Sequence, residues 1–368
     1  MLCKPTQINY AQKERKTKML KNKTLKTSAL VLVFIFLIFP ILRVSVSAAT
    51  SDNNIDISNM ELYPGGMPFG VKILSKGLTV VKFSETEGKD ASAAFLAGIK
   101  IGDIITKING KEITNINDFV KEINSNNGEA VNVTVTRNNK EYSFTVIPKY
   151  DLKEKTFKTG VWVKDSTSGI GTVTFFNPTN NAFGGLGHAI SDSKSGKAIP
   201  VSRGMVLNVS INGVNKGTKG AAGELKGSFL PKKIGILTKN CDCGVFGIMS
   251  SSDIKFPQEK LKLCPMNEVK EGDAYIWCTI DETGPQKFNI QIYDISPCSG
   301  ETKNFKVKIT DNKLIDKAGG IVQGMSGSPI IQNGRIVGAI THVLINDPTQ
   351  GYGIFIENML NSMPDLLK

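Results

Sequence analysis

The sequence of 368 residues is poor in histidine and aromatic side chains: it has two His and two Trp, and aromatics make up 7%. Two histidines exclude a histidine-rich metal centre, and neither lies near Cys241 and Cys243, whose spacing resembles half of a metal site. The sequence also lacks zinc-finger spacing and any basic stripe interleaved with aromatics. These absences argue against a nucleic-acid binder despite a formal net charge of +12. We expect neither a metal nor a cofactor.

The positive charge is concentrated at the N-terminus. Residues 1–28 hold eight Lys or Arg and one acid, so they carry +7 of the net +12. An apolar run follows over residues 29–42, and then a stretch of small residues that a signal peptidase could cleave. A basic flank before an apolar run is the signature of a segment entering a membrane with its N-terminus in the cytoplasm. We therefore predict a signal anchor or signal peptide over residues 29–49, with a buried core helix as the alternative, and an extracytoplasmic remainder.

The rest of the chain has an ordinary globular composition, with 40% apolar residues and 36 glycines. Many glycines and few aromatics indicate turn-rich β structure, and the length favours two or three domains. Five cysteines follow the membrane segment, an odd number, and we expect them to be structural or partly disulfide-bonded. We predict a cytoplasmic tail at 1–28, the membrane segment at 29–49 and a polar linker at 50–65. A compact domain at 66–149 and a β-rich domain at 150–368 follow.

The first of these domains has strand patterns, a small-residue helix and one amphipathic helix. Ile116, Phe119, Val120 and Ile123 fall on one helical face. Residues 97–105, Ala-Gly-Ile-Lys-Ile-Gly-Asp-Ile-Ile, and the following Ile-Asn-Gly-Lys resemble a PDZ domain of the bacterial protease type. The resemblance implies an α+β fold that binds a peptide as an added strand, with a backbone loop receiving a carboxylate. That loop would fall on four residues that depart from the usual pattern, with a core-facing turn as the alternative: Pro68, Phe69, Gly70 and Val71.

Short strands separated by glycines fill residues 150–368, which predicts an all-β barrel or a pair of barrels. Two glycine-rich passages within it carry candidate chemistry. In one, three glycines shortly precede His188; the other reads Gly-Met-Ser-Gly-Ser-Pro over residues 324–329. A serine hydroxyl needs a base to take its proton, and a tight turn can aim backbone N–H groups at the oxyanion. Hence Ser326 is the candidate nucleophile and His188 the candidate base. The N–H groups of Gly324 and Ser326 are the candidate oxyanion hole.

The second passage resembles the serine loop of chymotrypsin-like peptidases. The chain as a whole is similar to the SpoIVB peptidase family. The similarity rests on this serine loop, residues 338–353, His188, the PDZ-like region and the membrane segment, and it covers essentially the whole chain. The resemblance implies a mainly β fold with a chymotrypsin-like double β-barrel. It also implies a sporulation serine endopeptidase that cleaves itself and a regulator of an intramembrane protease complex. The latter cleavage would trigger pro-sigma-K processing in the space between forespore and mother cell. The implied catalytic residues are His188, Asp311 and Ser326.

Several alternatives stay open at the sequence level. Ser328 is a second candidate nucleophile and His342, on an apolar strand, a second candidate base. Three further acids compete with Asp311 because sequence does not show which carboxylate reaches the histidine: Asp192, Asp316 and Asp347. Met325 occupies the position where chymotrypsin-like peptidases usually have an acid, which pairs with the N-terminus that zymogen cleavage creates. We therefore expect that this protein is not activated by such a cleavage.

A catalytically inactive, PDZ-containing adaptor is the competing function. It would bind an extracytoplasmic partner instead of cleaving one. The enzyme hypothesis predicts protein substrates, self-cleavage, a peptide ligand for the PDZ domain and membrane association through the N-terminal segment.

Overall fold

A computed structural model describes residues 55–85, 91–192, 196–250, 259–296 and 302–367. The predicted tail and membrane segment lie outside the described residues. No helix in these described ranges is long and apolar enough to cross a bilayer.

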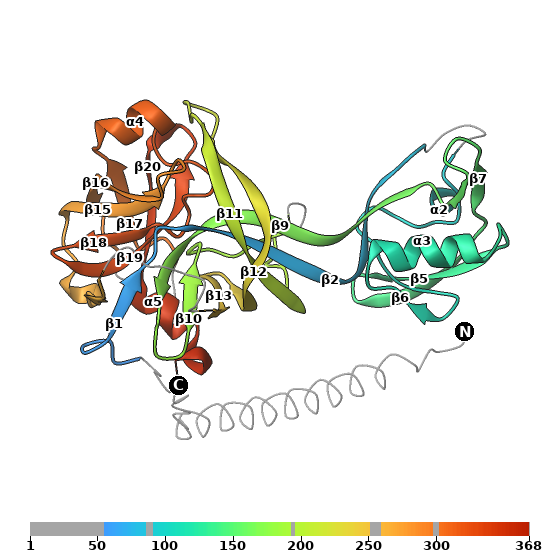
Figure 1. Cartoon of the computed structure of the whole chain (residues 1–368), viewed down its shortest axis with the longest axis horizontal. Coiled ribbons are helices and arrows are strands. Elements are labelled where there is room, and N and C mark those ends of the chain that lie inside the picture. Colours follow the sequence, from blue (N-terminus) through green and yellow to red (C-terminus); the bar gives the residue numbers. More distant parts are fainter. Residues whose placement is uncertain (1–54, 86–90, 193–195, 251–258, 297–301, 368) are drawn as a thin grey trace, which may run out of the picture. The chain divides into compact units, whose positions relative to one another are not determined.

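The first β-barrel is a ring of six antiparallel strands that closes where β9 pairs with β2 (Figure 1). In ring order the strands are β2 (Pro68–Phe83), β9 (Val161–Phe176), β10 (Ala182–Gly185), β13 (Gly244–Met249), β12 (Glu224–Cys241) and β11 (Arg203–Asn215). Inward-facing apolar side chains such as Phe69, Phe183 and Val245 are fully buried. Because closure leaves few free edges, strands as glycine-rich as β10 remain paired.

The second barrel is also closed by six strands, and it carries the Ser326 loop. Its order is β15 (Gly272–Thr279), β16 (Pro285–Tyr293), β17 (Phe305–Ile309), β20 (Asp347–Phe355), β19 (Arg335–Leu344) and β18 (Pro329–Gln332). The short helix α4 (Asn312–Ala318) follows β17, and α5 (Ile356–Asn361) with the 3₁₀ turn Pro364–Leu366 closes the chain. The predicted pair of barrels is therefore confirmed.

The PDZ domain lies between β2 and β9, both of which continue from it into the first barrel. Its elements are α2 (Ala93–Leu96), β3 (Ile104–Ile108), β4 (Lys111–Glu112), α3 (Ile116–Ser125), β5 (Val131–Arg137) and β6 (Lys140–Val146). The predicted amphipathic helix is present as α3, and β5 and β6 pair as a hairpin. Asn138 and Asn139 turn the hairpin at φ 50° and 60°, which suits a two-residue turn.

The Ile-Gly-Asp motif of this domain has a structural role. Asp103 is fully buried and forms two 2.7 Å hydrogen bonds with the Arg137 guanidinium, and it accepts the Lys100 N–H at 2.8 Å. A bidentate, charge-assisted pair of this kind fixes both side chains.

Part of the predicted linker belongs to the barrels. Residues Glu61–Pro64 form β1, which pairs with β9 and with β14 (Leu261–Lys262). Leu62 is fully buried in a core cluster with Phe175, Ile354 and Met359. The barrel core is thus built from residues on both sides of the PDZ domain. A polar composition over residues 50–60 concealed this, because only four residues carry the strand.

Leu62→Ala should therefore destabilise the core that the two barrels share. Removing a fully buried leucine costs roughly 2–5 kcal/mol, since a cavity remains. The matched control is Leu152→Ala, whose side chain is 84% exposed and should change stability by no more than about 0.5 kcal/mol. Urea unfolding of the full chain measures both. Equal stability of Leu62→Ala and wild type would mean that residues 61–64 behave as a linker.

Candidate active site

The Ser326 loop begins where α4 ends, at Gly319 with a left-handed φ of 78°. The Ser326 hydroxyl donates to the Thr341 carbonyl at 2.7 Å. The Ser328 hydroxyl is fully buried and donates to the Met325 carbonyl at 2.6 Å. A fully buried hydroxyl cannot reach a substrate, so Ser326 is the serine placed for chemistry.

The residue before the nucleophile serves the core. Met325 is fully buried, and its sulfur accepts the Val322 N–H at 3.5 Å. An apolar side chain at this position gives a cationic N-terminus nothing to pair with. That no activation of this kind occurs stays a prediction.

Strand β9 holds the loop from the first barrel. Thr172 donates its N–H to the Ser326 carbonyl at 2.9 Å and its hydroxyl to the Gly324 carbonyl at 2.8 Å. Thr174 donates its hydroxyl to the Gly327 carbonyl at 2.8 Å. A Cβ atom on Gly327 would lie 2.0 Å from the Thr172 carbonyl oxygen, so glycine is required there. Sequence reasoning missed Thr172 and Thr174, because their partners lie about 150 residues away.

The predicted oxyanion donors are available. Among the described residues, neither the Gly324 N–H nor the Ser326 N–H donates a hydrogen bond, whereas Gly327 and Ser328 donate theirs to Ile340 and Met325. Gly324 has φ of 97°, which glycine adopts at low cost. Two free N–H groups on a fixed loop are the arrangement that stabilises a developing oxyanion.

His188 lies on the loop after β10, next to the serine loop. Gly187 packs so tightly on Thr341 that a Cβ would meet the Thr341 methyl at 2.8 Å, and Thr341 in turn accepts the Ser326 hydroxyl. The imidazole Nδ1 lies 2.9 Å from the Ala189 carbonyl oxygen. Since a carbonyl only accepts, Nδ1 carries the proton and Nε2 keeps its lone pair. Burial lowers the pKa of His188, against a smaller upward effect of the Ala189 carbonyl. The ring is therefore neutral, as a general base must be.

The second histidine lies against the first. The His188 and His342 rings are 4.9 Å apart between centroids and tilted by 39°. Within the described residues, the buried Nδ1 of His342 has no hydrogen-bond partner. Burial, with His188 and Lys303 nearby, lowers the pKa of His342 to about 4. Ser326, His188 and His342 are thus gathered at one place, and both imidazoles are uncharged.

The structure does not bring Asp311 to this place, which corrects the predicted triad. Asp311 is the N-cap of α4, and its Oδ1 accepts the N–H groups of Lys313 and Leu314 at 3.0 and 3.3 Å. Its Oδ2 accepts the Asn289 N–H at 3.2 Å. Among the described residues its carboxylate contacts neither histidine. The Asp347 carboxylate is likewise engaged, with Thr349 and Gln350.

The predicted carboxylate-binding loop of the PDZ domain also requires correction. Residues 68–71 lie in β2, where they pair with β9 on one side, and Gly70 and Val71 pair with β11 on the other. Phe69 is fully buried in the first barrel. The local motif predicted a free loop, but the peptide N–H groups of a strand between two neighbours are already paired. The alternative was a core-facing turn. Phe69 does face the core, but these residues form a strand and not a turn.

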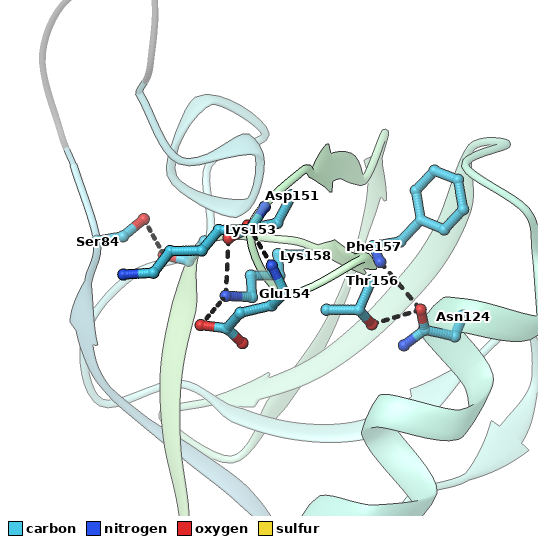
Figure 2. A network of polar contacts seen from close by, with 9 residues as sticks. Ser84, Asn124, Asp151, Lys153, Glu154, Thr156, Phe157 and Lys158 are labelled. Atoms are coloured by element: carbon cyan, nitrogen blue, oxygen red, sulfur yellow. Dashed lines mark hydrogen bonds and ion pairs between the residues drawn. The ribbon is translucent and has the colours of Figure 1, made fainter.

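The segment of residues 149–158 lies against the end of α3 in the PDZ domain (Figure 2). The Asn124 side chain accepts from the Thr156 hydroxyl and the Phe157 N–H at 2.6 and 2.9 Å. Lys158 bridges Asp151 and Glu154 at 2.8 and 2.7 Å and, by hydrogen bonding, lowers the pKa of Asp151 to about 2. The hairpin β7 (Lys149–Asp151) and β8 (Thr156–Lys158) is thereby fixed to the end of α3.

The described residues contain no group of three or more His, Cys, Asp or Glu that could hold a metal ion. The cysteines within the described ranges (Cys241, Cys243, Cys264 and Cys278) are free thiols, and burial raises the pKa of Cys243 and Cys264. The remaining two, Cys3 and Cys298, lie outside those ranges.

Two closed barrels that bring a serine loop to a neutral histidine define a serine peptidase, and a family model agrees. The model described as SpoIVB peptidase S55 matches residues 155–360, and a PDZ domain model matches residues 65–147. The first match covers more than half of the chain. The protein belongs to the SpoIVB peptidase S55 family and carries a PDZ domain.

Solved structures show more distant similarity. The PDZ domain of an SdrC-like protein from Listeria monocytogenes is 22% identical, with 25% of this chain and 93% of that chain covered and a TM-score of 0.22. The active form of the Rv3671c protease from M. tuberculosis is 14% identical, with 54% and 74% covered and a TM-score of 0.33. Human heparin binding protein is 11% identical, with 50% and 73% covered and a TM-score of 0.26.

Substitution of Asp311 tests whether this residue is only the N-cap of α4 or also the catalytic acid. Asn caps helices about as well as Asp, but its amide nitrogen cannot accept the Asn289 N–H as Oδ2 does. Asp311→Asn should therefore lose less stability than Asp311→Ala, which should lose roughly 0.5–2 kcal/mol. If Asp311 acts only as a cap, Asp311→Asn should also react with a serine-directed phosphonate at a rate within a few-fold of wild type. A loss on the order of 10⁴-fold in Asp311→Asn would instead place Asp311 on the histidine.

His342 should make stability depend on pH. Its pKa is about 4 when folded and near 6.5 when unfolded, so between these values the unfolded chain binds a proton that the folded chain does not. The contribution is complete above pH 6.5 and is lost as pH falls toward 4. When the pH falls from 7 to 4.5, the free energy of unfolding of His342→Gln should therefore decrease less than that of wild type. Urea unfolding at both pH values measures this difference. An identical loss in both proteins would contradict the assignment.

Proposed function

We propose that this peptidase is a sporulation endopeptidase that cleaves itself and a membrane-bound regulator of an intramembrane protease complex. The second cleavage would trigger pro-sigma-K processing across the forespore membrane. Family membership supports the proposal, as does the N-terminal sequence, whose basic residues 1–28 and apolar residues 29–42 suit delivery across a membrane. The space between forespore and mother cell is the compartment this proposal requires.

One observation carries the catalytic part of the proposal. The Ser326 hydroxyl, the backbone N–H groups of Gly324 and Ser326 and the neutral His188 imidazole meet where the two barrels are linked by Thr172. Neither N–H group donates to a residue in the described part of the chain. In the resting arrangement the hydroxyl donates to Thr341 instead of to His188. Catalytic hydrogen bonds are often long or absent before substrate binds, so this arrangement is compatible with a working enzyme.

The proposed reaction uses these groups in sequence. The Ser326 hydroxyl leaves the Thr341 carbonyl and gives its proton to Nε2 of His188 while Oγ attacks the peptide carbonyl carbon. The N–H groups of Gly324 and Ser326 bind the resulting oxyanion. His188 returns the proton to the leaving amine as the acyl-enzyme forms. A water deprotonated by His188 then attacks the acyl carbon, and His188 gives that proton to Oγ of Ser326 as the acid product leaves. During both steps the Ala189 carbonyl accepts the Nδ1–H of the imidazolium.

The PDZ domain is proposed to bind a peptide and to help control self-cleavage. The sheet edge at β2 is paired with residues 161–164 of β9, so a peptide added as a strand would need another edge.

The competing function, an inactive adaptor, is supported by two observations: Ser326 and His188 share no hydrogen bond, and Asp311 is engaged elsewhere.

Labelling with a fluorophosphonate distinguishes an enzyme from an adaptor. The full-length wild type should react and should show self-cleavage fragments, whereas Ser326→Ala should do neither. Ser328→Ala is the matched control: it removes a neighbouring hydroxyl that is fully buried, so labelling should persist. If the wild type and Ser326→Ala are equally unreactive and equally intact, the protein is an adaptor.

A further inference from the structure

The proton on His188 is held by a backbone carbonyl, which raises the question of what holds that carbonyl. Nδ1 of His188 lies 2.9 Å from the oxygen of Ala189, the next residue in the chain. A peptide carbonyl on an unsupported loop would move with the loop. It could then not select one tautomer of the imidazole, as a general base requires.

The loop is supported by the Ile199 N–H, which donates to the Ile190 carbonyl at 2.9 Å, and by one side chain from β12. Asn240 accepts the Ile190 N–H at its Oδ1 (2.8 Å) and donates from Nδ2 to the Ile190 carbonyl, also at 2.8 Å. The same Nδ2 donates to the Ile199 carbonyl at 2.8 Å. One amide therefore grips both backbone groups of the residue that follows Ala189 and ties them to the returning chain at Ile199.

Asparagine suits this position for a chemical reason. The site needs one acceptor, for an N–H group, and two donors, for two carbonyls, and a primary amide offers both. An aspartate would place an oxygen where the two carbonyl oxygens point. The backbone of Asn240 is itself fixed, because it pairs with Val245 in β13 at the end of the barrel.

We propose that Asn240 is the positioning residue of the active site: it fixes the Ile190 backbone, so that the Ala189 carbonyl holds the Nδ1–H tautomer of His188. Asn240 thus orients the imidazole through the backbone, and not by direct contact with it. This inference rests on the proposed role of His188 as the base. Asn240 touches no reacting atom and acts only through the loop.

The first test needs no variant. The chain has only two histidines, so ¹⁵N-histidine labelling of the full-length protein gives two imidazole spin systems, and His342→Gln identifies that of His188. We expect the Nδ1–H tautomer for His188 at pH 7. The Nε2–H tautomer in the wild type would overturn the proposal.

The second test measures reaction with a fluorophosphonate. Asn240→Ala removes all three hydrogen bonds, and the isosteric Asn240→Asp keeps only the acceptor for Ile190. In both, we expect the maximal labelling rate to fall at least tenfold, the half-saturating probe concentration to change less than twofold, and a mixture of His188 tautomers. Asn180→Ala is the matched control, since its amide also holds backbone, at Ala182 and Leu366, without touching the His188 loop.

The outcomes separate the two proposals. Wild-type labelling rates and a pure Nδ1–H tautomer in either folded Asn240 variant would refute the role of Asn240 while leaving the peptidase intact. Failure of the wild type to label refutes the proposed catalysis, and the tautomer of the wild type still reports on the Ala189 carbonyl. If Asn240→Ala does not fold, Asn240→Asp decides.

Discussion

The hydrogen bonds of Thr172 are the interaction on which the active site depends. This residue of the first barrel holds the Ser326 carbonyl with its N–H and the Gly324 carbonyl with its hydroxyl, and its own carbonyl accepts the Leu186 N–H at 3.3 Å. Leu186 begins the loop that carries His188. A single residue thus connects the nucleophile loop of one barrel with the base loop of the other. The relative placement of these two loops therefore does not rest on side-chain packing alone.

The electrostatics of the site follow from burial more than from charge pairing. Desolvation disfavours the charged forms of His188 and His342, and two rings 4.9 Å apart resist double protonation. A neutral imidazole needs only a fixed acceptor for its N–H. A backbone carbonyl supplies that acceptor without placing a charged carboxylate in a buried site. Asp311 does not contact the histidine in this arrangement. Its side chain instead accepts hydrogen bonds from N–H groups at the start of α4, which have no partner within the helix.

Local pattern predicted most elements of the fold, because periodicity, turn residues and glycine positions act over a few residues. The amphipathic helix over residues 116–125 and the short strands of residues 150–368 are examples. The errors arose where a local motif had a distant partner. Residues 68–71 read as a loop, but strands far along the chain pair with them on both sides. Asp311 fits a family pattern at its spacing from Ser326, yet its carboxylate is taken by its own helix and by Asn289.

The sequence by itself determined the nucleophile loop, the histidine, the PDZ-like domain and the charge distribution that marks the N-terminus. These are contiguous features, and each carries its chemistry in neighbouring residues. Only the tertiary structure decided which groups support them: Thr172 at the serine loop, Asn240 at the histidine loop and β1 in the barrel core. These contacts join residues from 50 to about 150 positions apart. The sequence around a polar side chain does not reveal which backbone group folding will bring to it.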